Sequence, residues 1–161
     1  MIFITVGSRS FQFNRLLKAV DDAIDSGKIT DEVFGQIGSS LYKVKHFETV
    51  AFLSHDEFND KLNECDIVLT HGGTGVIVNS VKMGKRVVAV PRLAQYNEVV
   101  DDHQIQLIRA FGKLDMVVPC YDCTSVGISE AIQIAKQRKM KPYISNTKVI
   151  IDSIDNFIIN G

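Results

Sequence analysis

The sequence has little cysteine, little proline and no excess of charge of either sign. Its 161 residues include three cysteines and three prolines, and the formal net charge is −1. Because no long basic block occurs, the electrostatic footprint of a nucleic-acid-binding protein is missing, and we expect no nucleic-acid partner. Linkers rich in proline or glycine, internal repeats and low-complexity tracts are also missing. We therefore expect a single domain over residues 1–161.

Long apolar runs are a further absence. No run of 18 apolar residues occurs, and the apolar start MIFITVGS is too short for the core of a signal peptide. These absences predict neither secretion nor membrane spanning. The expected location is cytoplasmic.

Two of the cysteines, Cys120 and Cys123, form one CxxC pair. A structural zinc site needs a second such pair or a set of Cys and His residues at suitable spacing, and neither occurs. We interpret both residues as free thiols in a strand-to-loop region rather than as redox groups or metal ligands.

What the sequence does contain is an alternation of short β-branched runs and longer segments of helical periodicity. The expected strands cover residues 1–6, 31–38, 47–53, 66–70, 86–91 and 116–119. The expected helices cover residues 13–25, 54–65, the segment from the glycine loop to about Met83, 99–111, 124–139 and 147–159. Ser54 with Glu57 three residues later has the pattern of a capping box. The alternation predicts an α/β fold with one Rossmann-like, doubly wound, mainly parallel sheet.

The stretch THGGTGVIVNSVKMGKRVVAVP places a histidine and three glycines at the end of an expected strand. Ligands of open α/β sheets bind at the carboxyl ends of strands. Gly72, Gly73 and Gly75 leave the backbone bare, and the N–H groups at the start of the following helix favour a phosphate. Thr74 adds a hydroxyl donor. His71, either protonated or with a neutral ring N–H, can meet the same diphosphate.

Two common phosphate motifs do not fit this stretch. A Walker A loop would need glycine where Asn79 stands, and the dinucleotide fingerprint GxGxxG would need it at Val78. A plain strand-to-helix turn, with His71 an ordinary loop residue and Asn79 solvated, stays open. Because Asn79 lies four residues after Gly75 on the same helical face, we expect it to reach a ribose hydroxyl.

A second polar group, DDHQ, stands near the start of the helix expected over residues 99–111. Gln104 falls on the inward stripe of that helix, with His103 beside it. An amide is a poor core residue and a good reader of hydroxyl groups. The alternative is an acidic first turn that complements the helix dipole, which accounts for Asp101 and Asp102 better than for Gln104.

Together, HGGTGVIVNSVKMGKRVVAVP and DDHQ resemble the C-terminal, donor-binding domain of family 28 glycosyltransferases. The start MIFITVGS with Phe13, the central QIG and the short length resemble the small catalytic subunits of two-component UDP-sugar transferases, which make dolichol-linked chitobiose or the repeats of capsule and exopolysaccharide. The resemblance covers most of the chain. It implies the donor half of a GT-B glycosyltransferase that adds galactose, glucose or N-acetylglucosamine, with inversion, to a lipid-diphosphate-linked sugar.

The same resemblance implies roles for individual residues. It assigns the diphosphate of a UDP-sugar to the glycine loop, which comprises His71, Gly72, Gly73, Thr74 and Gly75. The ribose position is usually Glu in the family and is Asn79 here, which cannot make the charge-assisted bond of a carboxylate. His103 and Gln104 match the positions that contact the donor sugar. Gly7 and Ser8 match a segment that faces the acceptor.

In the resembling enzymes the reaction takes place between two Rossmann-like halves, and helix-tip N–H groups, not a metal, neutralise the departing UDP. No convincing DxD stands at a strand end, so we expect no metal and no other cofactor. One α/β domain forms only one wall of such a cleft, which implies a membrane-anchored, acceptor-binding partner that recruits the chain to the cytoplasmic face. The helix expected over residues 147–159 either docks on that partner or packs on the chain's own core.

No residue of the sequence can be assigned as the general base, which must lie within hydrogen-bond reach of the acceptor hydroxyl. Two alternatives to a catalytic subunit therefore stay open. One is a nucleotide-sugar-binding or regulatory subunit without catalysis of its own, and the other is an NAD-binding Rossmann enzyme.

Overall fold

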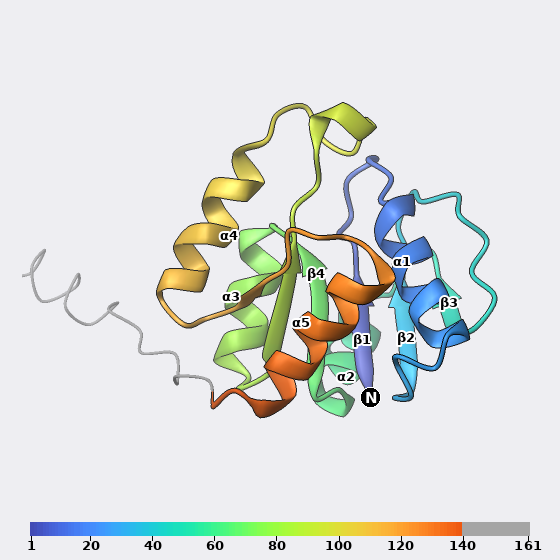
Figure 1. Cartoon of the computed structure of the whole chain (residues 1–161), viewed down its shortest axis with the longest axis horizontal. Helices are drawn as coiled ribbons and strands as arrows, with labels where there is room; N and C mark the ends of the chain where they lie inside the picture. Colours follow the sequence, from blue (N-terminus) through green and yellow to red (C-terminus); the bar gives the residue numbers. More distant parts are fainter. Residues whose placement is uncertain (140–161) are drawn as a thin grey trace, which may run out of the picture.

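The computed structural model describes residues 1–139 (Figure 1), and the helix expected over residues 147–159 lies outside this range. Six parallel strands form one sheet in the order β3-β2-β1-β4-β5-β6. The strands are β1 (Ile2–Thr5), β2 (Val33–Gln36), β3 (Glu48–Val50), β4 (Ile67–His71), β5 (Arg86–Val90) and β6 (Val118–Pro119). The helices are α1 (Asn14–Asp25), α2 (His55–Glu64), α3 (Thr74–Lys82), α4 (His103–Lys113) and α5 (Ser125–Gln137), with a short 3₁₀ helix η1 (Ala94–Tyr96). The prediction of a doubly wound α/β sheet is confirmed.

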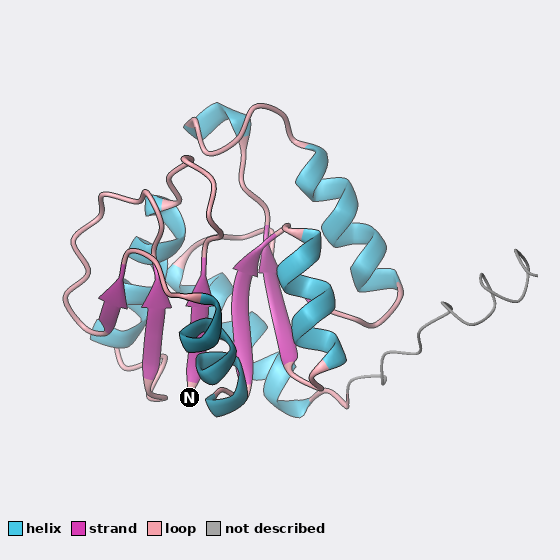
Figure 2. Ribbon diagram, turned by 180° about the vertical axis from the view of Figure 1, so that it is seen from behind, coloured by secondary structure: helices cyan, strands magenta, loops and turns pink. Residues whose placement is uncertain are grey.

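Helices cover both faces of the sheet (Figures 1 and 2). Successive residues of β1 point to opposite faces, so Ile2 and Ile4 join the cluster under α1 and α5, whereas Phe3 joins the cluster under α2, α3 and α4. The central strands are buried along almost their whole length. This double coverage explains why the sequence shows unbroken β-branched runs instead of alternation.

The order of the strands reverses between β1 and β4, which lie side by side with Thr5 paired to Thr70. The chain leaves β1 for α1 on one face and leaves β4 for α3 on the opposite face. The two loops diverge, and this is the topological switch point at which open α/β sheets bind ligands.

Helix α2 begins where the sequence predicts. Ser54 Oγ accepts a hydrogen bond from the Glu57 N–H at 3.3 Å, and Glu57 Oε2 accepts one from the Ser54 N–H at 2.8 Å. The predicted capping box is therefore confirmed.

The start of the helix predicted over residues 99–111 is wrong, because α4 begins at His103. Asp101 Oδ1 accepts from the His103 N–H at 3.0 Å, and Asp102 Oδ1 accepts from the Ala94 N–H at 2.8 Å. Side-chain bonds of this kind to the nearby backbone compete with helix formation. The residues before His103 therefore belong to a loop that is tied to η1.

Strands β2 and β3 are shorter than the predicted ranges 31–38 and 47–53. Gly38, two residues after β2, has φ +55°, a left-handed conformation that turns the chain out of the strand. Strand β3 lies at the edge of the sheet and pairs with β2 alone. Because β3 has only three residues, few unpaired backbone groups are exposed at this edge of the sheet.

Candidate functional site

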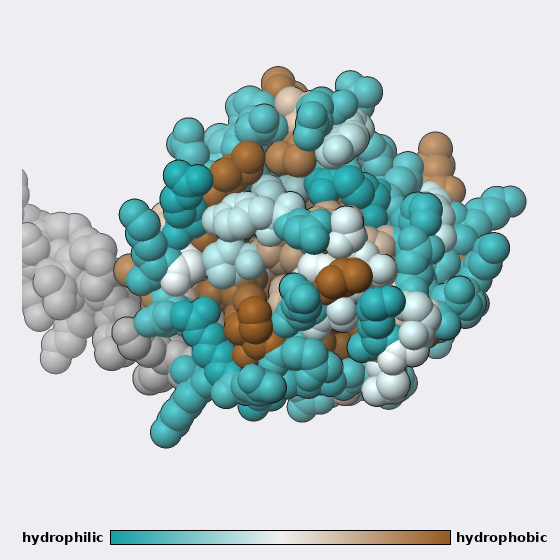
Figure 3. Space-filling view, in the orientation of Figure 1, coloured by the Kyte–Doolittle hydropathy of each residue, from teal (hydrophilic) through white to brown (hydrophobic). Residues whose placement is uncertain are grey.

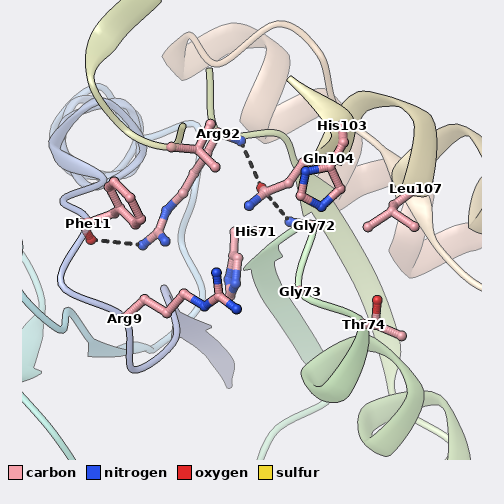
Figure 4. A pocket seen from close by; sticks show the side chains of 11 residues that line it. Arg9, Phe11, His71, Gly72, Gly73, Thr74, Arg92, His103, Gln104 and Leu107 are labelled. Atoms are coloured by element: carbon pink, nitrogen blue, oxygen red, sulfur yellow. Dashed lines mark hydrogen bonds between the residues drawn. The ribbon is translucent and has the colours of Figure 1, made fainter. Parts of the chain in front are cut away.

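A cavity of about 230 Å³ lies at the carboxyl ends of β4 and β5 (Figure 4). Four segments form its walls: the loop after β1, the glycine loop between β4 and α3, the loop after β5, and the first turns of α4. The lining residues are Arg9, Phe11, His71, Gly72, Gly73, Thr74, Arg92, Val99, His103, Gln104 and Leu107. Six of the residues that the sequence assigns to donor binding thus come together: His71, Gly72, Gly73, Thr74, His103 and Gln104.

The ring of His71 lies against two glycines, Gly7 and Gly73, where a larger residue would force the ring to move. A Cβ atom on Gly73 would lie 2.5 Å from His71 Nε2, and a Cβ atom on Gly7 would lie 2.7 Å from His71 Cε1. Gly7 also has φ +81°. The bare backbone at these positions therefore makes room for the histidine ring as well as for a ligand.

His71 is neutral at pH 7 in this environment. Burial lowers its pKa to about 4, the positive charges of Arg92 and Arg9 act in the same direction, and a hydrogen bond with the Thr5 backbone opposes them. Of the two ring states that the sequence leaves open, this environment favours the neutral one. A neutral ring has a single N–H, and the hydrogen bond with the Thr5 backbone carbonyl uses it, so the other ring nitrogen is an acceptor.

Arg92 lies two residues after β5 and is 2% exposed. Its Nη2 donates to the backbone oxygens of Val6 at 2.6 Å and Phe11 at 3.1 Å, and its guanidinium carbon lies 5.4 Å from the centre of the Phe13 ring. Among the described residues, its Nε has no hydrogen-bond partner. Burial lowers the pKa of Arg92 to about 10, so the group is still charged at pH 7.

The buried carboxylate of the same loop, Glu98, is paired with a different arginine. Its oxygens accept from Arg15 Nε at 3.1 Å and Arg15 Nη2 at 2.8 Å, and Oε2 also accepts from the Leu93 N–H at 3.0 Å. Within residues 1–139, Arg92 forms no ion pair with a carboxylate. The charge of Glu98 favours the charged form of Arg92 but makes no hydrogen bond to it, and a buried charge without a bonded counterion is costly. An anion in the cavity would compensate this cost.

Gln104 is 7% exposed, in agreement with the predicted inward position. Its Oε1 accepts from the Gly72 N–H and from the Arg92 N–H, each at 3.1 Å, so the side chain joins the glycine loop to the loop after β5 (Figure 4). Its carbonyl oxygen is therefore occupied by the protein. Only the amide nitrogen is left for the hydroxyl-reading role that the sequence suggests.

Gly7 and Ser8 line a second cavity, of about 330 Å³, and Gly7 also lies against the His71 ring. Thr5 and Gln36 give it polar groups, and its apolar walls come from Leu53, Phe58 and Val76. The predicted acceptor-facing residues are thus close to the glycine loop without sharing the first cavity.

Two predicted residues, Gly75 and Asn79, line neither cavity. Both are exposed on α3, and a Cβ atom on Gly75 would meet nothing within 4 Å. Their predicted roles toward diphosphate and ribose remain predictions.

The sequence reasoning missed the two arginines of the cavity. Arg9 and Arg92 each follow the carboxyl end of a strand, as the glycine loop does, so the rule that identified the glycine loop applies to them too. It missed the apolar lining as well, which consists of Phe11, Val99 and Leu107.

The CxxC pair lies away from the cavity. Cys120 is buried, Cys123 is half-buried, and both are free thiols. Burial raises the pKa of each to about 12, so neither is a reactive thiolate at pH 7. Within residues 1–139 no group of three or more His, Cys, Asp or Glu side chains is placed to hold a metal ion. In the same range, no helix has the length and apolar character needed to cross a bilayer.

The charge of the cavity determines what it can bind. Two arginines and the N-terminus of α3 bring positive charge to it, and none of the described lining residues is Asp or Glu. Helix α3 has no side-chain cap at Gly73, so its first N–H groups are open to a ligand. The arrangement suits a phosphate or diphosphate group.

Comparison with solved structures supports the fold. The calicheamicin glycosyltransferase CalG4 superposes with a TM-score of 0.59 at 18% sequence identity, covering 84% of this chain and 34% of that protein. The predicted Rossmann-like half of a GT-B glycosyltransferase is therefore confirmed as a fold.

Three similar proteins are each named UDP-N-acetylglucosamine transferase subunit ALG13. The chain is 25% identical to the Candida albicans protein over 81 residues, 23% to that of Yarrowia lipolytica over 108 and 28% to that of Saccharomyces cerevisiae over 140. The alignments cover 50%, 65% and 83% of this chain but 26%, 53% and 66% of the relatives. The chain thus spans less than two thirds of the length of each.

The comparison with protein families extends over almost the whole sequence. Residues 1–157 match the glycosyltransferase family 28 C-terminal domain. With the glycine loop, the His103–Gln104 pair and the switch point of the sheet gathered at one edge, this chain belongs to the glycosyltransferase family 28 C-terminal domains.

Proposed function

We propose that this chain is the UDP-sugar-binding, catalytic subunit of a two-component, inverting glycosyltransferase. The observation that carries the proposal is Arg92, a buried cation without a carboxylate partner, which lines a cavity at the N-terminus of α3 in a family 28 domain. A doubly charged diphosphate supplies the missing counterion.

The size of the cationic cavity limits how much of a UDP-sugar it holds. At about 230 Å³, it is smaller than the roughly 300–1,000 Å³ of pockets that enclose a drug-sized ligand. We place the diphosphate in this cavity, against Gly72, Gly73 and Arg92, with the sugar toward His103 and Gln104. The uridine then lies outside the cavity, in a direction that lets its ribose approach α3.

In the proposed reaction, an acceptor hydroxyl oxygen attacks C1 of the donor sugar, and the bond from C1 to the β-phosphate oxygen breaks. UDP leaves with the electron pair, while the hydroxyl proton passes to a base for which we propose no residue of this chain. Arg9, Arg92 and the N–H groups of α3 would balance the charge that develops on UDP, without a metal ion or other cofactor. Because Arg92 and the N–H groups of α3 are fixed before the reaction, they stabilise the transition state with little rearrangement.

We further propose that an acceptor-binding chain covers the carboxyl edge of the sheet. The similar proteins are named as subunits. Four large apolar side chains in the segments at this edge are exposed: Leu41, Phe52, Tyr96 and Val100. By contrast, the face covered by α1 and α5 is mostly hydrophilic, with small scattered apolar spots (Figure 3).

For the donor, the names of the similar proteins make UDP-N-acetylglucosamine the first to test, with UDP-glucose and UDP-galactose beside it. For the acceptor, we propose a lipid-diphosphate-linked sugar of a polysaccharide pathway such as capsule or exopolysaccharide synthesis. The partner would then be membrane-anchored and hold this chain at the cytoplasmic face.

A thermal-shift screen tests the donor site on the isolated chain. UDP and its sugars should raise the midpoint, since a ligand at 100 times its dissociation constant stabilises by about 2.7 kcal/mol, and NAD should not. In a Gly73→Asp variant that is folded by circular dichroism, the UDP effect should vanish, because the new carboxylate repels the diphosphate. Stabilisation by NAD alone would overturn the proposal.

Transfer assays separate catalysis from simple binding. The chain co-expressed with an acceptor-binding chain should transfer sugar, and the same pair carrying Gly73→Asp should not. A pair that keeps its activity with Gly73→Asp would show that the chemistry is carried elsewhere.

A further inference from the structure

Asp101 makes two hydrogen bonds to the same residue, His103. Its Oδ1 accepts from the His103 backbone N–H at 3.0 Å and lies 2.5 Å from Nδ1 of the imidazole ring. His103 lines the cationic cavity, whereas Asp101 does not. The carboxylate therefore contacts His103 from outside the lining of the cavity.

This contact determines which ring nitrogen of His103 carries the proton. An ionised carboxylate can only accept hydrogen bonds, so Nδ1 has to carry the proton. The pKa of Asp101 is lowered by these same two bonds from His103, which keeps the carboxylate ionised. In the neutral ring, Nε2 is then an acceptor, and it is the only polar ring atom that His103 can present to the cavity.

The next residue, Gln104, can offer a ligand only a hydrogen-bond donor. Because Gln104 Oε1 accepts from the backbone N–H groups of Gly72 and Arg92, the amide nitrogen is what Gln104 can offer a ligand, and it only donates. Figure 4 shows the two side chains next to each other at the start of α4. A hydroxyl group both donates and accepts, so two adjacent sugar hydroxyls match this acceptor and donor.

The pair of Asp101 and His103 contributes little to the fold. The two side chains are 66% and 57% exposed, and exposed pairs add little to stability. The bond from the His103 backbone N–H to Asp101 accounts for the start of α4, whereas the bond from the ring is explained by its effect on the ring.

We propose that Asp101 is a positioning residue that locks His103 in the Nδ1–H tautomer, so that Nε2 accepts a hydrogen bond from a hydroxyl of the donor sugar. This inference rests on the proposed function for the identity of the ligand. The tautomer itself does not depend on it.

The first test is nitrogen NMR of the full chain labelled with ¹⁵N-histidine, with His103→Gln used to assign the signal. The neutral His103 ring should show a protonated Nδ1 and an unprotonated Nε2. In Asp101→Asn, the amide can donate to Nδ1, and the population should move toward the Nε2–H tautomer. Asp102→Asn, whose side chain binds the Ala94 N–H, is the matched control and should leave the ring unchanged. A wild-type ring that is mainly Nε2–H, or an Asp101→Asn ring identical to wild type, would overturn the proposal.

The second test compares the calorimetric affinities of UDP and UDP-N-acetylglucosamine, UDP-glucose and UDP-galactose. Asp101→Asn should weaken binding of the UDP-sugar that wild type prefers by about threefold to tenfold, the loss expected for one neutral hydrogen bond, and should leave UDP binding unchanged. If wild type binds UDP and its sugars but Asp101→Asn keeps their ratio, the positioning role is wrong. If wild type binds none of them, the proposed function fails, and the NMR result stands separately.

Discussion

A Cβ atom on Gly73 would lie 2.5 Å from Nε2 of His71, so the last residue of β4 and the residue before α3 are matched in shape. Because Gly73 has no side chain, the imidazole ring of His71 packs against its backbone, next to the start of α3. A ligand anion bound by the first N–H groups of α3 would therefore lie close to this ring.

Gly73→Ala is expected to lower UDP affinity by about tenfold or more. The new methyl group forces the His71 ring away and moves the N–H groups that bind phosphate, and a factor of ten corresponds to about 1.4 kcal/mol. Gly75→Ala is the matched control, since its Cβ meets nothing within 4 Å. Alanine there should raise stability by up to about 1 kcal/mol, because glycine is a poor helix former, and should leave UDP affinity nearly unchanged. Calorimetry and chemical denaturation give both quantities, and equal UDP affinities for the two variants would contradict the account.

Arg92→Met is expected to weaken UDP binding strongly, about tenfold or more, because the site loses its buried positive charge. The effect on stability is smaller than the loss of two hydrogen bonds suggests, since removing a buried unpaired charge offsets part of it. Arg109→Met controls for the loss of one charge from the protein, as Arg109 is exposed on α4 and does not line the cavity. The salt dependence of UDP binding should become shallower in Arg92→Met alone. A UDP affinity in Arg92→Met within twofold of the Arg109→Met value would count against an anion site.

His71 predicts a pH dependence of stability. Its pKa is about 4 in the folded chain and about 6.5 when unfolded, so the unfolded state binds a proton at a higher pH than the folded state does. The contribution of this group is fully present above about pH 6.5 and is lost as the pH falls toward 4, by up to about 3 kcal/mol. The His71→Asn variant lacks the titrating group. Urea denaturation of both proteins from pH 7.5 to 4.5 should show that the difference between their free energies of unfolding changes in this window. A constant difference would mean that the pKa of His71 is not lowered by folding.

Asn79→Glu tests the predicted ribose contact. If Asn79 faces the ribose, a carboxylate should raise UDP affinity through a charge-assisted bond to a hydroxyl, and 2′-deoxy-UDP should lose part of that gain. Stability should change by less than about 0.5 kcal/mol, since the residue is exposed. Calorimetry with the two nucleotides measures the effect. An unchanged UDP affinity would place Asn79 away from the ribose.

The features that could be predicted from the sequence depend on neighbours in the chain. Ser54 and Glu57 lie three residues apart, so their capping box is visible as a pattern. The glycines after β4 signal a bare backbone by their own nature, and the alternation of strands and helices indicates the sheet. For these features, local chemistry and the final fold agree.

The features that were missed depend on contacts between distant segments. The unpaired state of Arg92 follows from carbonyl groups 86 and 81 residues away and from the pairing of Glu98 with Arg15. Gln104 accepts from Gly72 across 32 residues, so its periodicity indicates burial but not the loss of its carbonyl oxygen. The late start of α4 follows from the Asp102 bond to Ala94, eight residues away, which helical periodicity does not indicate.

The most direct test of a UDP-sugar site at the switch point is a titration of the ¹⁵N-labelled chain with UDP, followed by backbone amide NMR. Such a site predicts saturable chemical-shift changes that are largest for the amides of Gly72, Gly73 and Thr74. The Arg92 side-chain Nε–H signal should move in parallel, and the amides of α5 should change little. Saturable shifts that cluster elsewhere, or no shifts at millimolar UDP, would contradict it.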